Sequence, residues 1–545
     1  MDTTRDEVQD VLSLIEDEGL PYPSSPLLAS FVTEALNPVL AARYVKGRLL
    51  HGEGSSLVAN WSYIIESITE NASSPPPPNT AERQAIVRRD GNRCCVTGKP
   101  GILRDPLIVA PILPLPSRWT TDRDGMSDML GAFFGPPYRD WWLFYAKNPD
   151  HMSPYSNHWL VRRSAAKVFA HGLVKLDRRQ PSMVEYTLEH VLIKPEDPIE
   201  VDGMYPLLGD HSREGIEKVD PRFIGTHARL CKGIQFLEIQ KIISSRAAEP
   251  PRPLSTWLTG PGICGALSIF FSAALLTVWR IAPSNIRFAA YGMLHKFGSF
   301  LYGQEHPTVQ RLPLGLYLKY HDESGESHNE FNALRVVRRH TSVPTPSPLD
   351  LVSASSAAYF LTTRVRGFPL SRCLDVLSDR DCEQIATELK DYLGQLRDIP
   401  NPSSLNNSIS NTLGEACTDQ RISGGRPVGP FPDEASFSQV LRFSDEPARR
   451  GHRIVFTHAD LNPRNILVDK IARSDGTTGW GVTGIVDWET AGHYPEYWEY
   501  TKAMFEGFRW PRRYNDLIRG VFQEFGDYSK ELDVERRSWE SGDAV

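Results

Sequence analysis

The stretch FTHADLNPRNILV, residues 456–468, places a His, an Asp and an Asn between two apolar ends. Its pattern is His458-x-Asp460-x-x-x-x-Asn465, and Asp487 follows at the end of the apolar run TGIVD. Two carboxylates and a carboxamide offer the hard oxygen atoms that Mg²⁺ prefers. In phosphoryl transfer one Asp orients the attacking hydroxyl and can accept its proton, while an Asn and a second Asp hold metal ions. The stretch therefore indicates phosphoryl-transfer chemistry.

Two further groups that this chemistry needs occur upstream. A Lys on a strand should hold the α- and β-phosphates, and an acid on the next helix should hold that Lys. Lys319 ends the strand-like run GLYLK, and Glu330 opens the helical run NEFNALRVVRRH. A lone His-x-Asp is usually a turn, and a lone Lys at a strand end is usually solvated. Because four elements come in the required order, each on the required type of element, we interpret them as one catalytic set.

The segments around these residues predict the fold class. TVQRLPLGLYLKY alternates and predicts a hairpin of two strands, and AAYFLTTRV is typical of a strand. ESHNEFNALRVVRRH and DCEQIATELKDYLGQLRDI have helical spacing, and GVTGIVDWE indicates a strand that runs into a turn. Strands first and then mostly helices predict an α+β domain with two lobes.

The quoted motifs also carry a family resemblance. THADLNPRNILV followed by GIVDWETAGHYPEYWEY resembles the aminoglycoside phosphotransferase and choline kinase-like family, above all its branch common in filamentous fungi. The resemblance covers about residues 298–525. It implies a protein-kinase-like fold, bilobal, with a β-rich N-lobe and a helical C-lobe, and an ATP- and Mg²⁺-dependent enzyme.

The resemblance also implies roles for single residues. Asp460 corresponds to the catalytic Asp, and Asn465 and Asp487 correspond to the Mg²⁺ ligands. Lys319 and Glu330 correspond to the ion pair that spans the N-lobe.

Two further matches concern the loop and the hinge. His458 corresponds to a residue that braces the catalytic loop. LTTRVRG matches the hinge, whose backbone meets the adenine of ATP, and this implies nucleotide contacts by Thr362, Thr363, Arg364 and Val365.

The sequence departs from the family pattern at two places. The family usually has Gly between the His and the Asp, and here Ala459 stands there, which is tolerable if its φ is negative. There is also no G-x-G-x-x-G motif before Lys319, where only Gly298 and Gly303 offer a flexible phosphate cover.

The segment DWETAGHYPEYWEY bears on the acceptor. Asp487, Glu489, Glu496 and Glu499 occur there among Tyr and Trp residues, which would suit a cationic acceptor through charge and cation–π contact. The alternative is that these residues cap the core of the C-lobe. Trp488 and Glu489 are expected on the substrate side.

The expected activity is transfer of the γ-phosphate of ATP to a hydroxyl of a small molecule, as in a small-molecule kinase. The alternative is a non-catalytic scaffold or binding protein with two degenerate enzyme domains.

A second resemblance concerns residues 81–98, AERQAIVRRDGNRCCVTG, which predict a helix, a turn at Asp90 and Gly91, and then a strand. This opening resembles HNH-endonuclease-like domains of fungal proteins and implies an α+β domain over residues 81–245. In that chemistry one His activates water and the others bind the metal ion.

The catalytic set of that second family is incomplete. Pro111 stands where the first His belongs, Ala166 where the second His belongs, and Ala170 where an Asp belongs, while His158 and His171 lie off register. We therefore expect an inactive domain, and a nuclease is the less favoured alternative. The net charge of −7 provides no basic footprint, so no nucleic-acid partner is expected.

The chain of 545 residues is too long for one core. Composition breaks at Pro-rich stretches predict five parts: a helical segment with a Pro-rich linker (1–80), the HNH-like domain (81–245), a linker with a hydrophobic helix (246–284), the kinase-like domain (285–530) and a tail (531–545).

Cellular location is the last expectation from the sequence. Seven scattered Cys without a CxxC pair, and an acidic start without a signal peptide, predict a cytoplasmic protein. The run 254–279 has no charged residue, and we interpret it as a packed helix because its apolar residues form one stripe. A membrane anchor is the alternative, since the length of the run is at the threshold for spanning a bilayer.

Overall fold

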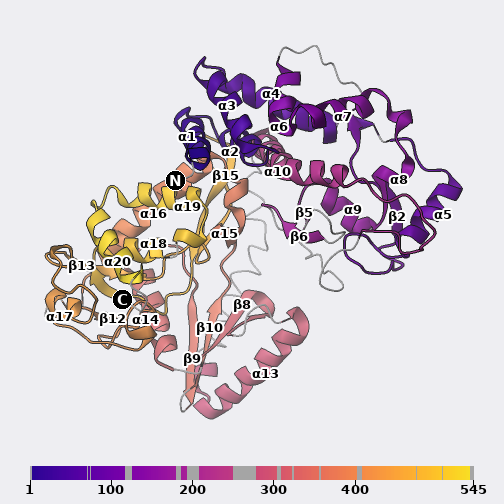
Figure 1. Ribbon diagram of the computed structural model, residues 1–545. Coiled ribbons are helices and arrows are strands. Elements are labelled where there is room, and N and C mark those ends of the chain that lie inside the picture. The colour runs from indigo at the N-terminus through magenta and orange to yellow at the C-terminus, as the bar shows by residue number, and fades with distance from the viewer. Residues whose placement is uncertain are drawn as a thin grey trace. The chain divides into compact units, whose positions relative to one another are not determined.

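The computed structural model describes residues 3–69, 72–73, 75–116, 125–178, 186–192, 208–248, 278–303, 308–321, 324–354, 357–401, 408–473, 475–505 and 507–540. The chain divides into two compact units, Met1–Ser245 and Arg246–Val545 (Figure 1). The finer division into five parts stays a prediction.

The uncharged run 254–279 lies almost entirely outside the described residues, so its interpretation as a packed helix also stays a prediction. Within the described ranges, no helix has both the length and the apolar character needed to cross a membrane.

Helices at the start of the first unit share a core with a later helix. They are α1 (Thr3–Asp17), α2 (Ser24–Thr33), α3 (Pro38–Leu49), α4 (Gly54–Thr69) and α6 (Met126–Phe134). Phe31, Trp61 and Phe133 lie at the centre, with ring centroids 5.1 Å apart for Phe31 and Trp61 and 4.6 Å apart for Trp61 and Phe133. The N-terminal helices therefore pack as part of this unit.

The remainder of the first unit combines short strands with helices. Its elements are β1 (Ala72–Ser73), α5 (Thr80–Arg89), β2 (Leu107–Pro111), β3 (Leu115–Pro116), α7 (Pro136–Lys147), α8 (Pro154–Asn157), β4 (His158–Arg162), α9 (Arg163–Ala170), β5 (Val174–Arg178), β6 (Tyr186–His190) and α10 (Pro221–Ala248). Strand β2 pairs antiparallel with β4, and α9 follows directly.

Helix α5 begins at a capping box between Asn79 and Glu82, and it ends at the predicted turn, where Gly91 has a φ of +65°. The strand predicted after this turn is wrong. The N–H of Gly98 bonds to the carbonyl of Cys94, and the N–H of Cys94 bonds to the carbonyl of Lys99, so the segment closes into turns.

The second unit begins with an antiparallel sheet of order β7-β8-β10-β9. Its strands are β7 (Val309–Leu312), β8 (Leu316–His321), β9 (Pro348–Ala354) and β10 (Ala357–Thr363), and the flanking helices are α13 (Ser284–Tyr302) and α14 (Ser324–His340). The predicted hairpin, strand and helix are all present.

The two faces of this sheet are covered by different helices. On one face, Leu318 and Leu361 form a core with Tyr291 of α13, which runs beside the sheet in Figure 1. On the other face, Phe360 packs with α14. Lys319 is the register partner of Phe360, so its side chain lies on the α14 face.

The rest of the second unit is mainly helical. Its elements include β11 (Phe368–Pro369), α15 (Leu370–Cys373), α16 (Asp379–Arg397), β12 (Ser410–Asn411), α17 (Glu434–Ser438), β13 (Ile454–Thr457), β14 (Ile466–Ala472), β15 (Thr478–Ile485), β16 (Gly492–Pro495), α18 (Trp498–Phe505), α19 (Arg512–Phe522) and α20 (Ser529–Glu540). Helix α16 starts at a capping box formed by Ser378 and Asp381. The unit is the predicted α+β domain, with a β-rich N-lobe and a helical C-lobe.

Candidate active site

The loop between β13 and β14 carries the quoted motif, and a buried carboxylate holds it. Glu499 of α18 is 4% exposed and accepts the backbone N–H groups of His458 at 2.7 Å, Ala459 at 3.1 Å and Leu461 at 3.2 Å. Hydrogen bonds to a charged acceptor are stronger than neutral ones. The loop conformation is therefore set by a side chain about forty residues further along the chain.

His458 connects this loop to the strand end that precedes Asp487. Its Nε2 lies 3.0 Å from the carbonyl oxygen of Val486 and donates to it, while its Nδ1 accepts the N–H of Asp460 at 3.2 Å. The ring contacts Trp488 at a centroid distance of 4.5 Å. Burial lowers the pKa of His458, in keeping with a neutral ring that donates through one nitrogen and accepts through the other.

Asp460 is held by two amides beside a Lys. The Nδ2 of Asn465 donates to its Oδ2 at 2.9 Å, and the Nδ2 of Asn462 does so at 3.2 Å. The Nζ of Lys502 lies 3.6 Å from its Oδ1. Burial raises the pKa of Asp460, and Lys502 opposes that rise. Because Asn465 turns its amide nitrogen to Asp460, its Oδ1 is the atom that can meet a cation.

Lys319 brings the two lobes together. Its Nζ lies 2.8 and 2.9 Å from the two carboxylate oxygens of Glu330 and 2.7 Å from Oδ1 of Asp487. Burial opposes the charge on Lys319, but Asp487 and Glu330 raise its pKa above the usual value. Lys319 in turn lowers the pKa of Asp487. Lys319, Glu330 and Asp487 therefore form one charged cluster.

Hydrogen bonds of Val486, which directly precedes Asp487 in the chain, join the backbone beside that charged cluster to the loop of Asp460. The N–H of Val486 donates to the carbonyl of Asn465 at 3.0 Å, and Val486 also accepts from His458. The structure thus places Lys319, Glu330, Asp487, His458, Asp460 and Asn465 in one continuous network.

Ala459 does not meet the condition of a negative φ, under which Ala is tolerable at this position. Its φ is +65°, in the left-handed region, and its side chain is fully buried. A residue with a Cβ pays about 1–2 kcal/mol in this region, which explains why the family usually has Gly there. The bonds from Glu499 hold the loop in this strained form.

The acidic stretch does not form one pocket. Glu499 is buried beneath the loop, and Glu496 pairs with Arg453 at 3.2 Å, so only Asp487 and Glu489 of the four predicted acids lie at the charged cluster. Burial, then Asp487, raises the pKa of Glu489 to about 7. The alternative reading, in which residues of this stretch cap the C-lobe core, therefore holds for Glu499.

The substrate-side position expected for Trp488 is also wrong. Its side chain is fully buried, and its Nε1 donates to the carbonyl of Ile485 at 2.9 Å. The ring instead supports His458 from within the C-lobe core.

The hinge residues are placed at the end of β10, but two of their backbone donors are already used. The N–H of Thr363 bonds to the carbonyl of Ser347 at 3.1 Å, and the N–H of Arg364 bonds to that of Gly315 at 2.8 Å. Thr362 lies within the β10 ladder, opposite Tyr317. Arg364 and Val365 are the predicted hinge residues beyond the end of the strand.

A cavity of about 470 Å³ flanks the hinge. It is lined by residues 338, 341–345, 363–366 and 483, and none of the residues of the charged network lines it. It is therefore distinct from the site around Lys319 and Asp460.

Gly298 has a packing role rather than that of a phosphate cover. A Cβ at this position of α13 would lie 2.5 Å from the carbonyl oxygen of Arg311 and 2.8 Å from Cγ of Gln310. Only Gly allows α13 to approach β7 this closely.

Residues 303–533 match the model of APH, the phosphotransferase enzyme family. The C-terminal unit contains a phosphotransferase-family domain. No curated protein matches the chain.

Several solved structures resemble this domain. A thermostable mutant of aminoglycoside phosphotransferase APH(4)-Ia, in a ternary complex with ADP and hygromycin B, is 13% identical, with 45% of this chain and 87% of that chain covered and a TM-score of 0.30. Aminoglycoside phosphotransferase APH(3'')-Id from Streptomyces rimosus is 18% identical, with 46% and 98% covered and a TM-score of 0.29. A putative fructosamine-3-kinase from Haemophilus somnus is 10% identical, with 42% and 77% covered and a TM-score of 0.28. Because these scores are low, the family assignment rests on the match of residues 303–533.

Two residues of the phosphotransferase domain escaped the sequence analysis. Asn329 of α14 donates from Nδ2 to the carbonyls of Glu489 at 2.7 Å and Ala491 at 2.9 Å, and so ties the helix to the loop after Asp487. Lys502 of α18 places its charge between Asp460 and Asp419, 3.6 Å from each. The only local sequence feature that pointed to Asn329 was a polar residue inside a helical pattern. No local sequence feature pointed to Lys502.

The structure also describes the first-unit residues at and near the expected nuclease positions. Pro111 and His158 are register partners at one end of the β2–β4 pair. His158 is buried, with Nδ1 donating to the carbonyl of Pro154 at 3.0 Å, and His171 follows the end of α9 in an exposed position. Among the described residues, neither His belongs to a group that could hold a metal ion. The HNH-like interpretation stays a prediction.

Proposed function

We propose that the phosphotransferase-family domain moves the γ-phosphate of ATP to a hydroxyl group of a small molecule in a Mg²⁺-dependent reaction. The observation that carries this proposal is the cluster of Glu330, Lys319 and Asp487, tied through the backbone of Val486 to the loop that carries Asn465 and Asp460. Such an arrangement matches the parts that phosphoryl transfer needs: a phosphate-binding Lys, metal ligands and a group that orients the acceptor.

The donor set fits the proposed cofactors. Asn465 offers a carboxamide oxygen and Asp487 a carboxylate, and both are hard oxygen ligands of the kind that Mg²⁺ takes. Lys319 has the charge and position to hold phosphate oxygens. Bound Mg²⁺ and ATP would supply the phosphoryl group and neutralise its negative charge.

Asp460 would orient the acceptor hydroxyl and accept its proton. Its carboxylate is fixed by Asn465 and Asn462, yet 29% of the side chain stays exposed, which leaves room for a substrate group. Burial raises the pKa of Asp460, which makes it a stronger base than an ordinary carboxylate. Lys502, beside it, would stabilise negative charge near the transferred group.

The acceptor is the part of the proposal that needs a direct experiment. The purified full chain would be incubated with Mg-ATP and a library of hydroxyl-bearing metabolites, and phosphorylated products would be detected by mass spectrometry. Asp460→Asn protein provides the blank, since it should bind the same compounds without turnover. We expect at least one product with the wild type that the blank lacks. Products formed equally by both proteins would contradict the proposed role of Asp460.

A further inference from the structure

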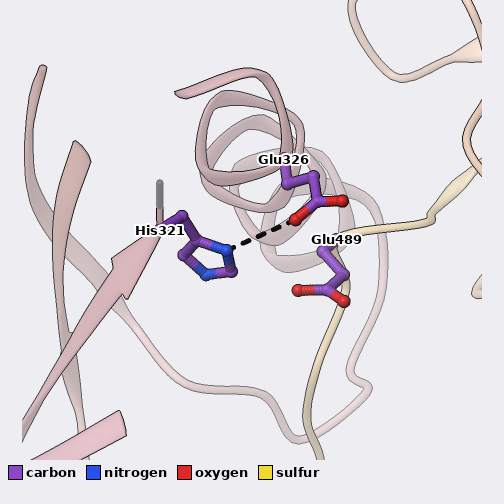
Figure 2. Close-up of side chains that lie close together, drawn as sticks. All are labelled: His321, Glu326 and Glu489. Carbon is purple, nitrogen blue, oxygen red and sulfur yellow. Dashed lines mark ion pairs between the residues drawn. The ribbon is translucent and has the colours of Figure 1, made fainter. Parts of the chain in front are cut away.

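Three side chains from three different elements converge beside the charged cluster. His321 ends β8, Glu326 lies near the start of α14, and Glu489 follows Asp487 by two residues. Nδ1 of His321 lies 3.4 Å from a carboxylate oxygen of Glu326. One ligand atom from each of the three residues lies within 4.8 Å of the other two, and Figure 2 shows the imidazole and the two carboxylates facing one another.

The ring nitrogen of His321 that does not face Glu326 has no protein partner among the described residues. The residue is 9% exposed, and its Nε2 is buried without a hydrogen-bond partner in the described part of the chain. A buried polar atom without a partner is costly, so native structures nearly always provide one. The imidazole is therefore a candidate to bind something other than protein.

The charges nearby point to a cation. Four carboxylates, those of Glu326, Glu330, Asp487 and Glu489, gather around two basic groups, Lys319 and His321. Lys319 forms its ion pairs with Glu330 and Asp487. Glu326 pairs with His321, which leaves Glu489 beside them without an ion pair among the described residues, and a partly buried carboxylate needs a positive partner.

The backbone that carries these groups is held in place. Asn329, one turn of α14 beyond Glu326, donates to the carbonyl of Glu489 at 2.7 Å. Helix α14 therefore fixes Glu326 directly and Glu489 through Asn329. A preorganised backbone lowers the cost of assembling ligands around an ion.

We propose that His321, Glu326 and Glu489 form a binding site for a divalent transition-metal ion of the Zn²⁺ or Mn²⁺ type. An imidazole and two carboxylates suit such ions better than Mg²⁺, which prefers oxygen ligands alone. Ligand atoms around tetrahedral Zn²⁺ lie about 3.3 Å apart, given bond lengths of about 2.0–2.1 Å, so rotation of the side chains must draw them together by at most about 1.5 Å. Water would complete the coordination shell. The ion would tie β8 and α14 of the N-lobe to the loop after β15, and the site does not depend on the proposed kinase activity.

Cobalt provides a direct probe of this site, because Co²⁺ replaces Zn²⁺ and its absorption reports the ligands. The full chain, stripped with EDTA and dialysed, would be titrated with Co²⁺ and, separately, with Zn²⁺ in a calorimeter. We expect one site with visible absorption bands in the wild type. His321→Ala should abolish it, and Glu489→Gln should weaken binding by about tenfold or more.

Two control variants test whether other residues that can bind metal ions account for the Co²⁺ binding. His328→Ala removes an exposed His from α14, the helix that carries Glu326. Asn465→Ala removes a proposed Mg²⁺ ligand. Both variants should bind Co²⁺ like the wild type. Thermal melts of all variants without metal check that each is folded. If His321→Ala does not fold, Glu489→Gln takes its place as the test of the site. Absence of a site in the wild type, or binding that survives both His321→Ala and Glu489→Gln, would overturn the proposal and leave His321 and Glu326 as an ordinary ion pair.

Discussion

Two regions of this chain resemble enzyme motifs, and they differ in what fills the critical positions. In the second unit, each predicted position, His458, Asp460, Asn465 and Asp487, carries a polar side chain, and each of these side chains makes hydrogen bonds. In the first unit, Pro111, Ala166 and Ala170 stand where the predicted HNH resemblance would require ligands. The comparison therefore contrasts a complete set of polar groups with a predicted resemblance that lacks them.

The polar groups that remain in the first unit serve packing. Arg89 and Asp90 form a buried ion pair at 2.7 Å, Asp90 accepts the N–H of Leu160 at 2.8 Å, and Arg89 donates to the carbonyl of His158 at 2.7 Å. These bonds hold the end of α5 against β4. Buried polar groups of this kind need no substrate to explain them.

The largest effect on activity is expected from a substitution of Asp460. Asp460→Asn should lower kcat about a hundredfold or more, because the amide cannot accept the proton of the acceptor. The Kd for Mg-ATP should change little, since Asp460 is not one of the proposed metal ligands. Steady-state kinetics and nucleotide titration measure both quantities, and Asp445→Asn, at an exposed position, provides the control. An unchanged kcat would remove Asp460 from the reaction.

The next effect tests whether the loop is built by Glu499. Glu499→Gln removes a buried charge that accepts three backbone N–H groups and should lower the free energy of unfolding by about 2–4 kcal/mol. Chemical denaturation measures this. Glu524→Gln is the matched control, because Glu524 is 68% exposed and pairs with Lys390 at 2.8 Å, and a surface pair of that kind contributes about 1 kcal/mol or less. Equal losses in the two variants would contradict the account.

Sequence patterns predicted the parts of the site that depend on local order. The alternation before Lys319, the helical spacing after Glu330 and the apolar run before Asp487 each specify one element, and the spacing places the side chain on it. Glu499, Asn329 and Lys502 act through contacts with residues 38 to 160 positions away in the sequence. No local pattern reports such contacts, so their roles came only from the structure.

The wrong expectations have the same origin. The segment after Gly91 has strand-like composition, but bonds within residues 94–99 close it into turns. Trp488 and Glu499 lie in an acidic, aromatic segment that suits a substrate pocket, yet tertiary packing buries both of them. The positive φ of Ala459 follows from the three bonds to Glu499 rather than from the preference of Ala.

A smaller effect is expected at Ala459. Ala459→Gly should relieve about 1–2 kcal/mol of backbone strain and lose about 0.4–1 kcal/mol through the freer unfolded chain, for a net stabilisation of about 0.8 kcal/mol. Denaturation of the two proteins in parallel measures the difference. A destabilisation of more than about 1 kcal/mol would show that the buried methyl group matters more than the strain.

In the first unit we expect no nuclease activity, so substitutions there should have no effect on DNA cleavage. The full chain should not nick supercoiled plasmid in Mg²⁺, Mn²⁺ or Zn²⁺, because Pro111, Ala166 and Ala170 supply no ligand atom. His158→Ala and His171→Ala should behave like the wild type in this assay. Metal-dependent nicking that either substitution abolishes would break the comparison, since it would reveal a working site out of register.

The most direct test of the central claim, that the network around Lys319 and Asp487 binds Mg-ATP, is the thermal shift that Mg-ATP causes. With nucleotide at about a hundred times its Kd, binding should stabilise the wild type by about 2.7 kcal/mol and raise its Tm by several degrees. EDTA should remove the shift and added Mg²⁺ restore it, while Asp487→Asn should show no shift and Asp460→Asn a full one. A wild type that does not respond, or a shift that persists in both EDTA and Asp487→Asn, would contradict the assignment of this site.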